Sequence, residues 1–176
     1  MDAAHFHLIL NHFPIIGTLI AVAILAYGLY AKNDSIKKVA LVTFILMAIL
    51  TIPVFLTGQE AEEVVEHIAG VSEDIIEEHE ELAEKAIWLM GVLGVLAIIN
   101  FYSITAKISI AKTITIITFA VSLATVGLFA KVGNEGGQIR HSEIRAGFSD
   151  SSNKINGSIK ENRSEKEDKE EHDDDD

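Results

Sequence analysis

Seven histidines are the side chains best suited to chemistry in this sequence. They are His5, His7, His12, His67, His79, His141 and His172. The chain has no cysteine, so disulfides, thiolate metal sites and cysteine nucleophiles are excluded, and histidine, carboxylate and methionine remain as the strong ligand types. These residue types predict a site that holds a metal ion or a histidine-ligated cofactor.

His79 is the strongest single candidate. It lies on an apolar stripe with Ile76, Leu82 and Ala83, whereas glutamates occupy the other faces of the same segment. A histidine on such a stripe points into a helical bundle, where it is either a hydrogen-bonded core residue or a ligand.

A second group of histidines opens the first apolar segment, where His5, His7 and His12 precede Pro14. Polar groups at membrane depth are costly and usually face the interior of a bundle, so we expect His12 to turn inward. The alternative is that these histidines only anchor the segment at the membrane surface.

Two further segments carry ligand types. His67 follows Glu63 by four residues, so both could bind one ion from one helical face, although this spacing is also frequent in solvated helices. The stretch after Gly136 combines arginine, histidine and carboxylate groups: Arg140, His141, Glu143 and Arg145. The alternative for that stretch is a simple turn at the membrane surface.

Four apolar runs must position these residues, at roughly 8–31, 39–58, 86–103 and 108–131. Each is close to the ~20 residues that a helix needs to cross a bilayer core, and open strands cannot satisfy their backbone there. The first run lacks a positive n-region and is too long for a signal peptide. The sequence predicts an all-α integral membrane four-helix bundle.

The connections between the runs predict its orientation. Segment 59–84 contains no lysine or arginine, whereas the other two connections carry lysines: Lys32, Lys37, Lys38, Lys107 and Lys112. Because short basic loops stay in the cytoplasm, we expect a protein of the cell (inner) membrane with both termini and segment 59–84 outside. All seven histidines then fall on the outer side, and this convergence is the main functional signal.

Segment 59–84 is expected to form an outer helical hairpin. The stretch Thr57–Glu60 reads as a capping box that starts a short amphipathic helix, and the apolar stripe from Ile75 runs without a breaker into the third span. Gly133 and Gly136 predict a turn after the fourth span. We assign residues 1–147 to the transmembrane domain and 148–176 to a disordered acidic tail, which is too poor in apolar residues to fold alone.

Three stretches carry a resemblance to small four-helix bacterial membrane proteins of uncharacterised function. They are the histidine-Asn11-His12-x-Pro14 opening, the Thr57-Gly58-x-x-Ala61-Glu62 stretch and the Gly-Gly-x-Ile-Arg140-His141-x-Glu143 stretch. The likeness covers about residues 4–145 and excludes the tail. In layout the chain is also similar to membrane b-type cytochromes, which commonly carry haem ligands near both faces, whereas this chain has no histidine near the inner face.

Three functions are compatible with these residues. A haem b for electron transfer would take two axial ligands from His12, His79 and His141, with Arg140 or Arg145 near its propionates. A divalent metal site for copper, zinc or iron handling or sensing would draw on a wider set: His5, His7, His67, Glu63, Glu66, Glu78 and Glu143. A structural subunit or assembly factor without a cofactor is the third.

Other functions have weaker support. Serines and threonines lack a convincing base partner and no phosphate-binding loop occurs, so the sequence favours a protein that is not an enzyme. The net charge of -12 argues against a nucleic-acid partner. The expected partners are the lipid bilayer and a redox partner or larger membrane complex.

Overall fold

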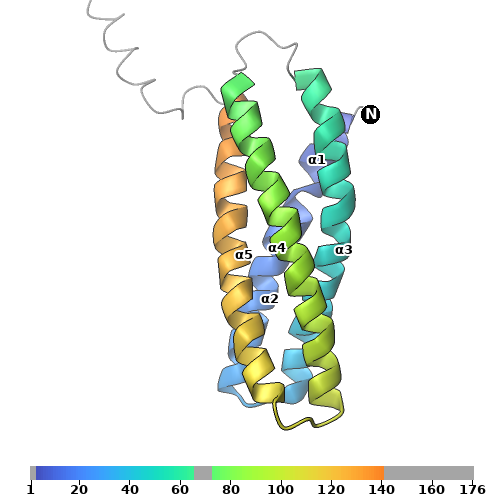
Figure 1. The fold of residues 1–176 in the computed structure, drawn as a ribbon, viewed down its shortest axis with the longest axis vertical. Coiled ribbons are helices and arrows are strands. Elements are labelled where there is room, and N and C mark those ends of the chain that lie inside the picture. Colours follow the sequence, from blue (N-terminus) through green and yellow to red (C-terminus); the bar gives the residue numbers. More distant parts are fainter. Residues whose placement is uncertain (1–2, 66–72, 141–176) are drawn as a thin grey trace, which may run out of the picture. The chain divides into compact units, whose positions relative to one another are not determined.

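The computed structural model describes residues 3–65 and 73–140, and these residues form helices and no strands. The elements are α1 (Ala3–Leu10), α2 (His12–Tyr30), α3 (Asp34–Val65), α4 (Glu73–Thr105) and α5 (Ala111–Arg140). Only Asn11 separates α1 from α2, and the two together make the first of four helices that are long and apolar enough to cross a membrane. The predicted all-α architecture with four membrane-length helices is confirmed (Figure 1).

Apolar side chains cover the outside of this bundle as well as its inside. Leu25, Phe44 and Leu93 are fully buried in the core, whereas many equally large apolar residues face outward, among them Leu19, Ile49, Val95, Ile116 and Leu123. A helix that is apolar all round fits a lipid surrounding, because exposed apolar area of this extent is rare on soluble monomers.

Glycines set the closest helix contacts. A Cβ added to Gly94 of α4 would lie 2.7 Å from the Cβ of Ala48 in α3. One added to Gly28 of α2 would lie 2.9 Å from the backbone nitrogen of Lys37 in α3. Small residues that let backbones approach are typical of helix packing in membranes, and here they bring α3 against both α2 and α4.

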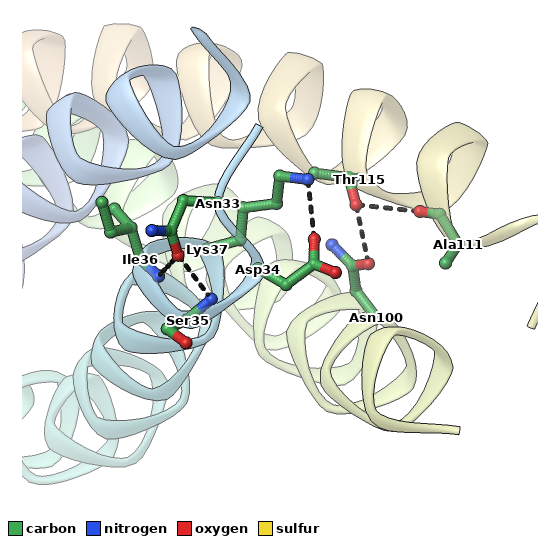
Figure 2. Close-up of polar contacts among 8 residues, drawn as sticks. All are labelled: Asn33, Asp34, Ser35, Ile36, Lys37, Asn100, Ala111 and Thr115. Carbon is green, nitrogen blue, oxygen red and sulfur yellow. Dashed lines mark hydrogen bonds and ion pairs between the residues drawn. The ribbon is translucent and has the colours of Figure 1, made fainter. Parts of the chain in front are cut away.

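A stripe of buried hydroxyl groups joins α5 to α4. The stripe consists of Thr115, Thr118, Ser122 and Thr125. Each hydroxyl donates to a carbonyl of its own helix, and Thr115 also donates to the Asn100 Oδ1 at 3.0 Å (Figure 2). The Asn100 Nδ2 donates in turn to Thr118 at 3.3 Å. The buried amide of α4 is therefore satisfied by α5, which fixes the pairing of the two helices.

The two short turns at the other end of the bundle share one geometry. Lys32 after α2 and Lys107 after α4 both have positive φ, 51° and 53°. In each turn the amide of the following residue, Asn33 or Ile108, donates five residues back, to Gly28 or Ser103. This is the Schellman ending of a helix, with lysine where glycine is usual.

Asn33 then starts α3. Its Oδ1 accepts hydrogen bonds from the Ser35 and Ile36 amides at 2.9 and 3.2 Å, and Lys37 pairs with Asp34 at 3.0 Å (Figure 2). An asparagine side chain on these amides satisfies donors that a helix start leaves open.

Two details differ from the sequence expectations. The capping-box reading of Thr57 is wrong, because α3 runs unbroken to Val65 and the Thr57 hydroxyl donates backward to the carbonyls of Pro53 and Val54. The turn predicted at Gly133 and Gly136 is also wrong, because α5 continues through both. The rod predicted for the third span is confirmed as the 33 residues of α4. The remainder of the outer hairpin and the acidic tail lie outside the described residues.

Candidate functional site

One end of the bundle collects α1, the end of α3, the start of α4 and the end of α5 (Figure 1). On α4, 20 residues separate Lys85 from the last residue, Thr105, a rise of about 30 Å that matches the ~30 Å hydrocarbon core. Trp88 and Tyr102 are exposed just inside these limits, as expected for residues at membrane interfaces. His79 precedes Lys85 by six residues, so it lies between this apolar stretch and the first residue of α4.

His7 is held by α3. Its ring is half-buried, and its Nδ1 lies 3.0 Å from the carbonyl oxygen of Val54. The same edge of the ring rests on Gly58, where an added Cβ would lie 3.0 Å from the His7 Cε1 and 3.2 Å from Nδ1. The Val54 carbonyl and the Gly58 backbone, on one face of α3, therefore hold this imidazole. We call such a pair of carbonyl and glycine a seat.

His79 is held by α5 in the same way. Its Nδ1 lies 3.1 Å from the carbonyl oxygen of Val132. An added Cβ on Gly136 would lie 2.9 Å from the His79 Cε1 and 3.3 Å from Nδ1. In both seats the glycine follows the valine by four residues, so carbonyl and glycine occupy one helical face.

These hydrogen bonds decide what each ring can offer. A carbonyl oxygen only accepts, so in each ring Nδ1 carries the proton and donates it. In a neutral imidazole the other nitrogen, Nε2, then keeps its lone pair. A histidine whose Nδ1–H is fixed by a carbonyl is the usual form of a metal ligand, because the bond sets both tautomer and orientation. His7 and His79 each present one such nitrogen.

The two histidines also lie at the same end of the bundle, within electrostatic range of each other. Although 72 residues separate them in sequence, His7 and His79 interact electrostatically, and Glu135 of α5 interacts with His79 as well. The structure thus brings together one histidine from the first helical hairpin and one from the second.

Carboxylates surround this end of the bundle. A hollow of about 330 Å³ lies between the outer ends of α3 and α4 and is lined by Glu62, Glu73, Ile76, Glu77 and Glu80. The last of these is adjacent to His79 in sequence. Lys85, the only lysine or arginine of α4, is paired with Glu81 at 3.0 Å. The local field therefore favours cations.

The other predicted ligands lie elsewhere. The inward orientation expected for His12 is wrong, because its side chain is exposed and its Nδ1 lies 2.9 Å from the Leu8 carbonyl of the same chain segment. His5, Glu63 and Glu78 are also exposed. Within residues 3–65 and 73–140, no three histidine or carboxylate side chains are grouped as a metal site.

Several candidates cannot be placed around the pair. Arg140 ends α5, and the remaining ones lie outside the described residues: Glu66, His67, His141, Glu143 and Arg145.

The carbonyls and glycines that hold the two imidazoles could not be predicted from the sequence. Nothing in it singled out Val54 and Val132, since any residue has a carbonyl, and Gly58 and Gly136 were interpreted as parts of a cap and a turn. A weak signal does exist, because in both stretches a valine is followed after four residues by a glycine and a glutamine comes soon after.

Comparison of the chain with protein-family models, curated proteins and solved structures finds no match.

Proposed function

We propose that this chain is a multi-pass membrane protein that binds a transition-metal ion at the outer end of its bundle and serves in metal handling or sensing there. The observation that carries the proposal is the pair of imidazoles, His7 and His79, each with Nδ1 fixed on a carbonyl. Their Nε2 atoms are the metal donors. Imidazole nitrogen suits copper, zinc and iron, which makes these the candidate ions.

The surrounding charge supports a cation as ligand. Glutamates line the hollow beside His79, and a field of this sign concentrates divalent ions near the site, whereas it repels anions. The outward orientation of this end is part of the proposal and rests on the lysines at the opposite turns, two of which, Lys32 and Lys107, occupy equivalent positions.

A haem b is the second candidate, and one observation favours it. Two histidines from different helices are the complete protein ligand set of a six-coordinate haem iron, since the porphyrin supplies the other four nitrogens. The carboxylates oppose this candidate, because haem propionates are anionic. In this form the protein would pass electrons to a redox partner.

The test is metal analysis and an absorption spectrum on the same detergent-purified protein. We expect stoichiometric copper, zinc or iron without a Soret band, and His7→Ala or His79→Ala should remove the metal. His12→Ala is the matched control, since the His12 side chain is exposed and its Nδ1 bonds to the Leu8 carbonyl, and it should retain the metal.

A Soret band lost in the same two variants would replace the bare ion with haem b. Protein that contains neither cofactor after growth with added metals and haem precursor would refute both candidates and leave a structural subunit.

A further inference from the structure

Asn11 occupies the break between α1 and α2, and its side-chain oxygen lacks a hydrogen-bond partner. The Asn11 Oδ1 is buried, and it is the one buried side-chain polar atom without a hydrogen-bond partner in the part of the chain that the structure describes. The side chain makes no capping bond to α2 either. Buried polar atoms are almost always paired, so an orphaned acceptor at the edge of a membrane calls for a partner.

The break itself has a covalent cause. Pro14 has no amide hydrogen, so the carbonyl of Leu10 loses the donor that a continuous helix would provide. The Asn11 amide still donates to the His7 carbonyl at 2.9 Å, so the chain does not unwind there.

Asn11 belongs to the same helical face as His7, which it follows by four residues. Side chains in a helix lean toward its N-terminus, so the Asn11 amide leans toward the turn that carries His7. Two ligand residues four apart on one helix are a recurrent way to grip a single ion. An amide oxygen is a suitable donor for such an ion, as a complement to imidazole nitrogen.

We propose that the Asn11 Oδ1 is the oxygen donor of the metal site and binds the ion held by His7 and His79, either directly or through one water molecule. This inference rests on the proposed function. It gives the ion two nitrogens and one oxygen from two helical hairpins, and it explains why a half-buried asparagine in an apolar segment has a buried side-chain oxygen without a hydrogen-bond partner.

The experiment titrates Zn²⁺ and Cu²⁺ into metal-free, full-length protein in detergent. Asn11→Leu should weaken the Kd about 10-fold or more, as loss of a ligand or its orienting group typically does. Asn11→Asp should tighten it at least about 10-fold, because a carboxylate adds charge at the same position. Thr18→Val is the matched control. It removes a buried hydroxyl of α2 that donates to the Met90 sulfur at 3.9 Å. This variant should leave the Kd unchanged.

The outcomes separate the inference from the proposed function. If both Asn11 variants bind within twofold of the native protein while His79→Ala weakens binding, Asn11 is no ligand and the function stands. If binding does not depend on His7 or His79, both proposals are overturned. If Asn11→Leu does not insert, Asn11→Asp decides alone, and an unchanged Kd rejects the inference.

Discussion

At the scale of single residues, the glycines under the two imidazoles matter as much as the imidazoles. Gly58 and Gly136 each leave a gap that the edge of a histidine ring fills. A ring displaced from that gap moves away from the valine carbonyl that fixes its tautomer. The position of the Nε2 donors is thus set by residues that never touch a ligand.

The first prediction concerns these glycines. Gly58→Ala or Gly136→Ala places a methyl group about 3 Å from a ring carbon, so the ring must shift and its Nδ1–H···O bond lengthens. Metal affinity should fall about 10-fold to 100-fold, the range seen when orienting groups of metal ligands are lost. Isothermal titration of metal-free protein measures the change.

Gly133→Ala is the control for both variants. Gly133 lies on α5 less than one turn from Gly136, and nothing is within 4 Å of an added Cβ there. Its affinity should equal that of the native protein. Equal losses in all three variants would mean that the helices tolerate no alanine here and that seating is not the cause.

The sequence predicted which residue types could act as ligands better than it predicted where their side chains lie. The absence of cysteine and the supply of histidine limit the ligand types, and that limit stays a prediction, whereas the inward position that the apolar stripe predicts for His79 is confirmed. His12 was predicted to face inward because polar groups avoid lipid. The Leu8 carbonyl of the preceding helix, α1, satisfies one ring nitrogen instead, a local solution that hydropathy does not reveal.

At the scale of elements, helix lengths followed from the apolar runs, but helix ends did not. The structure extends α3 and α5 past the glycines at which we expected them to stop. Glycine is a weak stop signal within a helix when neighbouring helices pack against it, because tertiary packing outweighs a propensity cost of about 1 kcal/mol. The same packing places the His7 ring against Gly58 and the His79 ring against Gly136.

The second prediction uses two glycines of α4 that are one turn apart. A Cβ on Gly94 would lie 2.7 Å from Ala48 of α3, whereas one on Gly91 meets nothing within 4 Å. Gly94→Ala should therefore push α3 and α4 apart and destabilise the fold by about 1–3 kcal/mol. Gly91→Ala should be neutral or stabilise it by up to about 1 kcal/mol through helix propensity.

Denaturant unfolding in detergent, followed by the fluorescence of the single tryptophan, Trp88, measures both changes. Equal effects of the two substitutions would show that α3 and α4 do not approach at Gly94 as described.

At the scale of the whole molecule, the segregation of charge determines how the bundle sits in a bilayer. The lysine-bearing turns lie at one end and the glutamate-rich helix ends at the other. Composition along the sequence was enough to predict this, because the spans, their number and the charge of their connections are all local properties. The direction of insertion follows only from the lysine rule and is a prediction.

The third prediction tests that direction. The chain lacks cysteine, so Asp34→Cys, Ile110→Cys and Glu77→Cys each introduce one unique thiol. In intact cells an impermeant maleimide should label position 77 and leave positions 34 and 110 unlabelled until the cells are opened. Labelling of 34 and 110 alone in intact cells would invert the topology and place the histidine pair in the cytoplasm.

Each hairpin contributes one histidine to the proposed site. Each supplies one histidine, one carbonyl and one glycine, with a left-handed lysine in the turn between them. Neither hairpin alone therefore holds more than half of the ligand pair. An ion bound by both binds only their associated state, and at 100 times its Kd it strengthens that association by about 2.7 kcal/mol. If the proposed site binds its ion, linkage therefore makes the association of the two hairpins depend on the metal concentration.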